Sequence, residues 1–139
     1  MYQKLLIPVD LSDKNEITLK TVQQVADPQA GTITLLHVIE TLQDVPFEEM
    51  KEFYQELKDR AERRLAIWMD TLGQRGFDVH SEIVFGKRGQ EIIRCAEDEE
   101  VDLIVLRSHT LDRSQPGRSI GTLSHQVALL APCSVLLIR

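Results

Sequence analysis

Cysteine is scarce in this chain of 139 residues, and the two cysteines, Cys95 and Cys133, stand far apart. They form neither a CxxC motif nor a cluster with the spacing of metal ligands. Three histidines, His37, His80 and His125, are scattered in the same way and have no partner at the spacing of a metal site. We therefore expect free, buried thiols in a reducing compartment, and neither a disulfide framework nor a zinc centre.

Long apolar runs are missing as well. The first apolar run, LLIPV at Leu5–Val9, is too short for the core of a signal peptide, and no run approaches the ~20 residues of a membrane span. We therefore expect a cytoplasmic protein without membrane association. The chain also lacks internal repeats, low-complexity segments and linkers. This predicts one domain over residues 1–139, which buries about two-thirds of its unfolded surface.

Positive charge is not in excess, because 16 lysines and arginines stand against 22 acidic residues, a formal net charge of −6. No strongly basic face is implied, which argues against general binding of nucleic acids. A small anion held by a local basic loop is still compatible with this balance. Hydrophobic residues make up 42% of the chain and charged residues 27%, as is ordinary for a globular protein.

Two kinds of periodicity divide the chain into strands and helices. Apolar or alternating stretches predict five strands, at Lys4–Val9, Thr32–Val38, Asp78–Phe85, Leu103–Leu106 and Ser134–Ile138. Apolar residues at three- and four-residue steps predict four helices, at about 13–26, 47–72, 88–99 and 123–130. Asp13 and Glu16 have the spacing of a capping box at the start of the first helix, with Ser12 as an alternative cap.

The alternation of strands and helices predicts an α/β fold, a doubly wound sheet of five mainly parallel strands. The third strand has one polar side, which suits the edge of a sheet. Ligands of such sheets bind beyond the carboxyl ends of the strands, where the strand order reverses. The candidate residues are therefore Asp10 after the first strand, Val38 at the end of the second, and Arg107 onward after the fourth.

The segment 101–122, VDLIVLRSHTLDRSQPGRSIGT, is the strongest candidate for a site. It predicts a buried strand, then a polar loop rich in arginine, then a helix that starts at Gly121-Thr122. A helix N-terminus offers free N–H groups and a partial positive charge, so this succession is typical of an anion site. As the alternative, Gly121 is only a helix N-cap and Thr122 a residue of the first turn.

Several segments together resemble the universal stress protein family. They are KLLIPVDLSD, ITLLHV, VFGKRGQEII, VDLIVLRSH and GTLSHQVALLAPCSVLLIR, in the family's order and over nearly the whole chain. The resemblance implies the sheet order 3-2-1-4-5, with four helices on the two faces. It also implies a homodimer in which the last strands of two subunits pair, here through Cys133 to Arg139. Many members bind ATP or AMP and serve in stress resistance or signalling.

The resemblance also implies which residues would line a nucleotide site. They are Pro8, Val9, Asp10, Val38, Leu106, Arg107, His109, Arg118, Gly121, Thr122 and Leu123. Asp10 either contacts the nucleoside or turns the chain into the first helix. His109 either matches the histidine between two glycines of the family's loop or is a surface histidine in a polar loop.

The phosphate loop of nucleotide-binding members follows a pattern that this chain breaks. The pattern is Gly, two residues, Gly, nine residues, then Gly and a small hydroxyl residue. Here Arg107 and Thr110 stand in place of the first two glycines, and ten residues separate Thr110 from Gly121. Glycine allows positive φ and close approach of the backbone to an anion, and both replacements carry a Cβ that opposes this.

Two functions follow from this loop. In the first, the protein is a homodimeric regulatory or protective module in stress response, with weakened or lost ATP binding. In the second, it is an ATP or AMP sensor in which Arg107 or Arg118 of the loop helps to hold the phosphates by paired hydrogen bonds. The nucleotide would then be held by Asp10, Val38, His109, Gly121 and Thr122. No Ser-His-Asp set, Cys-His set or acid–base pair can be assembled from the sequence, so we expect no enzymatic activity.

Overall fold

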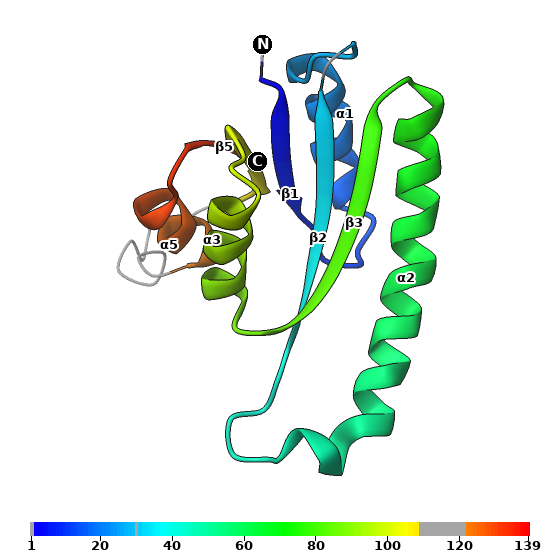
Figure 1. Cartoon of the computed structure of the whole chain (residues 1–139), viewed down its shortest axis with the longest axis vertical. Helices are drawn as coiled ribbons and strands as arrows, with labels where there is room; N and C mark the ends of the chain where they lie inside the picture. Colours follow the sequence, from blue (N-terminus) through cyan, green and yellow to red (C-terminus); the bar gives the residue numbers. More distant parts are fainter. Residues whose placement is uncertain (1, 30, 109–121) are drawn as a thin grey trace.

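The computed structural model describes residues 2–29, 31–108 and 122–139. Its strands are β1 (Lys4–Pro8), β2 (Thr32–Glu40), β3 (Asp78–Gly86), β4 (Leu103–Arg107) and β5 (Ser134–Ile138). Its helices are α1 (Asn15–Val25), a 3₁₀ turn η1 (Phe47–Met50), α2 (Lys51–Gln74), α3 (Arg88–Asp98) and α5 (Leu123–Leu130) (Figure 1). No helix among the described residues is long and apolar enough to cross a membrane.

The five strands form one sheet of order β3-β2-β1-β4-β5, in which every pairing is parallel. The predicted α/β fold and strand order are confirmed, and among the described residues the sheet is wholly rather than mainly parallel. Strand β3 lies at one edge, as its polar side suggested, and β5 lies at the other. The carboxyl ends of all five strands therefore point to the same end of the molecule.

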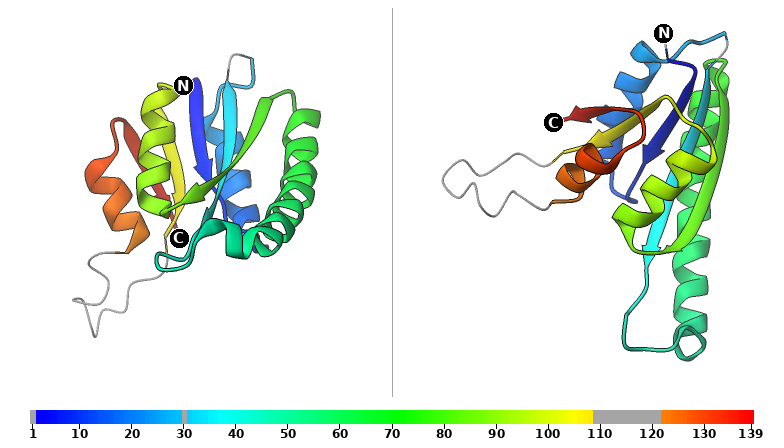
Figure 2. Two further views of the ribbon diagram at one scale, coloured as in Figure 1. Left: turned by 60° about the horizontal axis from the view of Figure 1, so that its bottom comes forward. Right: turned by 60° about the vertical axis from the view of Figure 1, so that its left-hand side comes forward.

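Helices cover both faces of this sheet (Figure 2). On one face α1 and α2 pack on a core that includes Leu5, Leu35 and Trp68. On the other face α3 and α5 pack on a core that includes Leu6 and Leu36. Neighbouring residues of one strand thus enter different cores, as strand geometry requires, and both faces of the central strands are apolar.

The predicted capping box at the start of α1 is wrong. The helix begins at Asn15, and Lys14, its N-cap residue, makes no side-chain capping bond. The Asp13 carboxylate instead forms a salt bridge with Arg64 of α2, whose guanidinium also lies 4.9 Å from the centroid of the Trp68 ring. The side chain that the local spacing assigned to a cap therefore contacts α2 instead.

Strand β1 separates from β4 near its carboxyl end. It pairs with β2 along its whole length but with β4 at only two positions. The Asp102 N–H donates to the Lys4 carbonyl, and the Val9 N–H donates to the Leu36 carbonyl. The backbone N–H and C=O groups of even-numbered residues of β1 therefore point to β4, and those of odd-numbered residues point to β2. Pro8 is even-numbered and has no N–H, which ends the ladder on the β4 side. The strand order reverses at this place, and the separation leaves space for a pocket.

An aromatic cluster holds η1 and the start of α2 beyond the end of β2. The Phe47 and Tyr54 rings stack with centroids 5.0 Å apart, and the Phe85 ring of β3 meets Phe47 edge-on at 5.3 Å. The Leu42 N–H donates to the Tyr54 hydroxyl at 3.0 Å. The predicted second helix is thus a 3₁₀ turn followed by α2, and it extends past the sheet on the side of the carboxyl ends (Figure 1).

Replacement of glycine by alanine should change the free energy of unfolding in opposite directions at Gly86 and at Gly73. Gly86, the last residue of β3, has a φ of 151°, and a Cβ there would lie 2.9 Å from Oε1 of Glu91. Gly86→Ala should lower the free energy of unfolding by about 1–3 kcal/mol, because alanine strains that backbone. Gly73 lies near the end of α2, and a Cβ there would meet none of the described residues within 4 Å. Gly73→Ala should therefore raise the free energy of unfolding by about 0.5–1 kcal/mol. Urea unfolding of both variants checks this, and equal losses at the two positions would contradict it.

Candidate functional site

A cavity of about 320 Å³ lies at the carboxyl ends of β1, β2 and β4, beside the first turns of α3 and α5. It is lined by eight of the eleven residues proposed for a nucleotide site, namely Pro8, Val9, Asp10, Val38, Leu106, Arg107, Thr122 and Leu123. The other three, His109, Arg118 and Gly121, lie outside the described residues. The eight described residues, which come from three separate segments of the sequence, therefore meet at one place.

Ten further residues, which the sequence did not assign to the site, line the same cavity. They are Leu11, Asn15, Leu36, His37, Ile39, Glu40, Leu57, Arg88, Ile92 and Ser124. Most belong to helices or strands that approach the cavity only after the sheet has formed, so no local signal marks them. Asn15 is the exception, because an amide on the inner side of a helix needs polar partners.

The Asp10 side chain organises the turn from β1 into α1. Its Oδ1 accepts hydrogen bonds from the Ser12 N–H at 2.8 Å, the Ser12 hydroxyl at 2.6 Å and the Asn15 amide at 2.7 Å. Asn15 is only 3% exposed and also donates to the Asp10 and Ser12 carbonyls. Asp10 therefore turns the chain into the helix, and the same turn places its carboxylate at the cavity.

The charge state of Asp10 follows from these contacts. Partial burial raises its pKa, but the hydrogen bonds from Ser12 and Asn15 and the positive charge of Arg107 outweigh burial, so the pKa lies below its ordinary value. The carboxylate is thus ionised at neutral pH and accepts hydrogen bonds without donating any. Its Oδ2 has no hydrogen bond to the described residues and is free to accept one from a hydroxyl or amine of a ligand.

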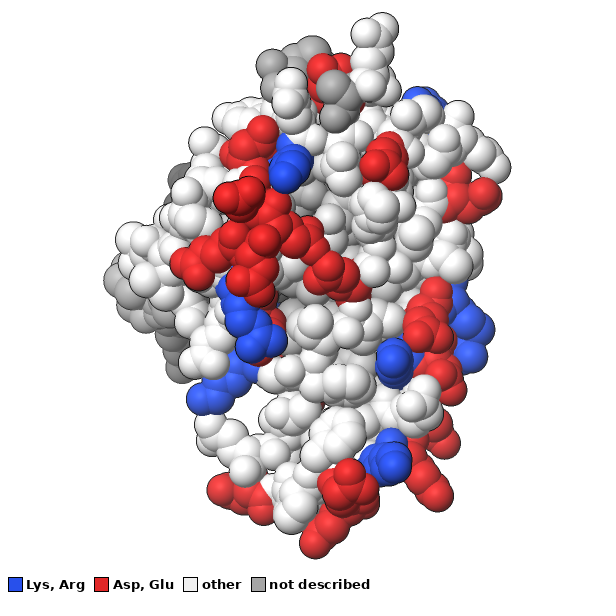
Figure 3. Space-filling view, in the orientation of Figure 1, with Lys and Arg blue, Asp and Glu red and all other residues white. Residues whose placement is uncertain are grey.

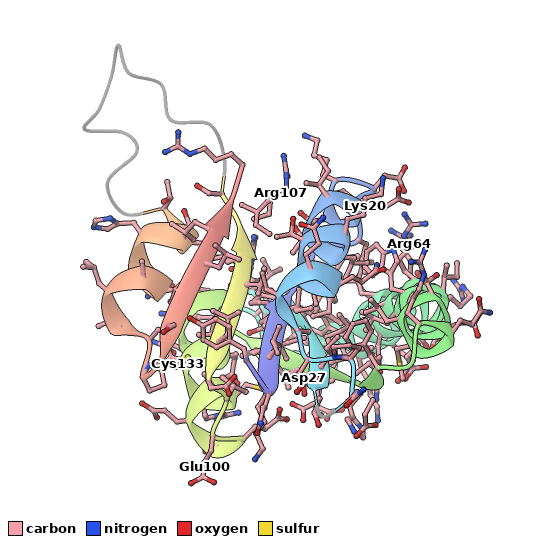
Figure 4. The ribbon with its side chains drawn as sticks, turned by 90° about the horizontal axis from the view of Figure 1, so that it is seen from above. Lys20, Asp27, Arg64, Glu100, Arg107 and Cys133 are labelled. Atoms are coloured by element: carbon pink, nitrogen blue, oxygen red, sulfur yellow. The ribbon has the colours of Figure 1, made fainter. Side chains whose placement is uncertain are left out.

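Arg107 is the last residue of β4 and is half-buried at the cavity wall. Figure 4 shows its side chain in the space between the end of β4 and α1. In the described part of the chain, Glu100 is the only residue other than glycine with a positive φ, so Arg107 is not strained. Arginine in place of the family's first glycine therefore adds a cation to the cavity and imposes no left-handed backbone.

Helix α5 begins at Leu123, as its spacing predicts, and Thr122 is its N-cap, so the alternative in which Gly121 is the N-cap and Thr122 lies in the first turn is wrong. Its Oγ1 accepts a hydrogen bond from the His125 N–H at 3.3 Å and lies 3.2 Å from the Ser124 hydroxyl. Leu123 and Ser124 in the first turn line the cavity. Their N–H groups have no carbonyl four residues earlier within the helix, so this end of α5 offers donors to an anion.

Two contacts shape the rest of the cavity. The Arg88 guanidinium at the start of α3 forms a salt bridge of 3.3 Å with Glu40 at the end of β2. Both side chains are about half exposed, so the pair contributes little to stability. The His37 Nδ1 donates to the Val9 carbonyl at 2.9 Å and holds the end of β1 beside β2.

The two cysteines are free, as the sequence predicts. Cys95 is buried, and Cys133 is half-buried just before β5. Burial raises the pKa of each thiol. Because the thiolate is the nucleophile, neither cysteine is activated for reaction at neutral pH.

Comparison with known proteins agrees with this geometry. The model of the universal stress protein family matches residues 1–139. A universal stress protein of Methanocaldococcus jannaschii is 32% identical over 126 residues, which cover 78% of each chain. The solved structure of that protein superposes with a TM-score of 0.83 and covers 99% of this chain and 96% of its own. The structure of UspA from Lactobacillus plantarum is 25% identical, with a TM-score of 0.77, and covers 99% of this chain and 98% of its own.

A more distant structure shares the fold. It is a universal stress protein of Arabidopsis thaliana described with AMP bound, 21% identical, with a TM-score of 0.69. The alignment covers 98% of this chain and 90% of that one. The sequence match over the full length, the strand order and the relatives agree, and the chain belongs to the universal stress protein family.

Proposed function

We propose that this protein is a regulatory or protective module of the stress response that binds an adenine nucleotide at the cavity. In this proposal the nucleoside part sits as in nucleotide-binding relatives, while the grip on a triphosphate is weakened. The single observation that carries the proposal is the meeting of eight expected site residues around one cavity of about 320 Å³. That volume falls at the lower end of the range for small-molecule sites.

The inner wall of the cavity suits a nucleoside. Val9, Val38 and Leu106 are buried and present apolar surface to it. The ionised Asp10 carboxylate at the rim would accept hydrogen bonds from the hydroxyls of a ribose or the amine of an adenine. Apolar walls with a few fixed polar groups are the usual composition of such a site.

The outer part of the cavity has fewer backbone contacts to offer a triphosphate. The first turn of α5 and the Arg107 guanidinium supply donors and positive charge for one phosphate. In the sequence, however, neither Arg107 nor Thr110 is the glycine that would let the backbone approach the β- and γ-phosphates. We therefore propose that AMP binds about as tightly as ATP.

Calorimetric titration with AMP and with ATP, each with and without magnesium, measures this preference. We expect AMP to bind with a dissociation constant below about 1 mM, and ATP to bind no more than about tenfold more tightly, a difference of ~1.4 kcal/mol. If neither nucleotide binds at millimolar concentration, the cavity is not a nucleotide site. The protein would then be a module that works through protein contacts alone.

Substitution of Asp10 tests the placement of the nucleoside. Asp10→Asn keeps an Oδ1 that can accept the turn hydrogen bonds, but removes the charge that would attract donors of the ligand. AMP affinity should fall about tenfold, corresponding to the loss of one charge-assisted hydrogen bond. Asp44→Asn, at an exposed position between β2 and η1, is the matched control and should leave the affinity unchanged. Equal affinity in both variants would show that the nucleoside does not lie against Asp10.

The oligomeric state belongs to the same proposal. We infer a homodimer in which β5 and the adjoining segment, Cys133 to Arg139, pair with the same segment of a second copy. Strand β5 is an edge strand, and Leu137 on it is 41% exposed. An open apolar edge is an aggregation hazard unless it is covered. We also propose that the chain acts as one domain in the cytoplasm and without enzymatic activity.

Sedimentation velocity at micromolar concentration tests the dimer. The wild-type protein should sediment as a dimer, and Leu137→Lys should sediment as a monomer, because a lysine on the edge strand opposes pairing. Leu42→Lys is the control, since Leu42 is 54% exposed but lies between β2 and η1. A monomeric wild-type protein would refute the dimer, and so would a Leu137→Lys variant that stays dimeric.

A further inference from the structure

Two carboxyl groups and a thiol meet between β3 and α3, away from the nucleotide cavity. They are Glu82 on β3, Cys95 on α3 and Glu99 at the C-terminal end of α3. One carboxylate oxygen of each glutamate and the Cys95 sulfur lie within 4.8 Å of one another. The sequence placed Glu82 on a polar side of its strand. In the structure that side faces α3, and both glutamates are only partly exposed.

Hydrogen bonds hold the two glutamates in place. The Cys95 thiol donates to Oε2 of Glu82 at 3.5 Å, and the hydroxyl of Thr34 on β2 donates to Oε2 of Glu99 at 3.0 Å. Thr34 is 5% exposed, so this hydrogen bond holds the Glu99 carboxyl against the sheet. The hydrogen bonds from Thr34 and Cys95 therefore hold the two carboxyls close to each other.

The surroundings of this pair are acidic. The charged and titratable residues that line the adjoining hollow are Lys4, His80, Glu82, Asp98, Glu99 and Glu100. His80 lies 3.2 Å from the Asp78 carboxylate, at the start of β3. Figure 3 shows acidic side chains gathered on this face of the molecule, over α3. Four carboxyls thus face one lysine and one histidine, which leaves two adjacent carboxylates poorly compensated if both are ionised.

We propose that Glu82 and Glu99 share one proton, and that this protonated pair is a pH-sensitive clasp that fastens the edge strand β3 to α3. A shared proton turns repulsion between the two carboxylates into a hydrogen bond that joins two elements distant in sequence. When the proton leaves, the repulsion pushes the end of α3 away from the strand. The pKa of Glu82 supports this, because its hydrogen bond with Glu99, its burial and the charge of Glu99 all raise it.

The direction of the pH dependence follows from the proton balance. In the unfolded chain Glu82 releases its proton at the ordinary value for glutamate, whereas the folded protein keeps it up to a higher pH. Between these two values the native state binds more protons than the unfolded state, so stability falls as the pH rises. The clasp is closed on the acidic side of this window and open above it.

Unfolding by urea at a series of pH values from about 4 to about 8 tests the clasp, with a chelator in every buffer so that no divalent cation bridges the carboxyls. We expect the wild-type unfolding equilibrium constant to rise with pH by about tenfold for each unit by which the Glu82 pKa is raised. Glu82→Gln should remove this rise, because an amide donates to Glu99 at every pH. Glu97→Gln removes the same charge from an exposed position of α3 and should keep the wild-type profile.

Glu99→Gln tests the other half of the pair and should flatten the pH profile like Glu82→Gln.

Hydrogen exchange adds a local readout. Relative to the intrinsic rates, amides of β3 and α3 in the wild-type protein should exchange faster as the pH rises, and those of Glu82→Gln should not. Parallel stability profiles in the wild-type protein and both amide variants would overturn the clasp. Amide variants that fail to fold at every pH would also overturn it. The clasp needs only one hydrogen-bond donor between the side chains at positions 82 and 99, and the amide supplies that donor.

Discussion

The early end of the pairing between β1 and β4 is the constraint on which the site depends. Strand β1 stays paired with β2 to its last residue, but Pro8 has no N–H to continue the ladder toward β4. The two strands therefore part where the sheet reverses its order, and the cavity opens between their ends. Asp10 and Arg107, the residues that follow or end these strands, reach the cavity for the same reason.

The inner part of the cavity has the usual composition of a small-molecule site, whereas the outer part departs from the glycine pattern of a phosphate loop. Val9, Val38 and Asp10 provide the apolar walls and the acceptor that a nucleoside needs, and the turn around Asn15 holds Asp10 in place. In the outer part, Arg107 stands at the position where a glycine would let a phosphate approach the backbone. Since Arg107 has an ordinary extended backbone, its effect is one of charge and bulk and not of strain. The inner part can therefore be kept while the outer part changes.

The fold was readable from the sequence, since the apolar runs and helical periodicity mark every strand and the main helices. Contacts between distant segments were not. Asp13 is drawn to Arg64 and does not cap α1, and Arg88 meets the cavity only because α3 crosses from β3 to the other face. Glu82 belongs to the polar side of the strand that the sequence assigned to the edge of the sheet, but α3 covers that side. Eight of the eleven site residues line one cavity, because the carboxyl ends of parallel strands lie at one edge of the sheet and the start of α5 lies beside them.

Nucleotide binding at this cavity requires the nucleoside to lie between the ends of β1, β2 and β4. The most direct measurement is an NMR titration of the ¹⁵N-labelled protein with AMP, followed amide by amide. We expect the largest shift changes at Val9, Asp10 and Val38 and at the first turn of α5, with the outer face of α2 unaffected. Changes centred on any other surface, or no changes at millimolar AMP, would contradict the account.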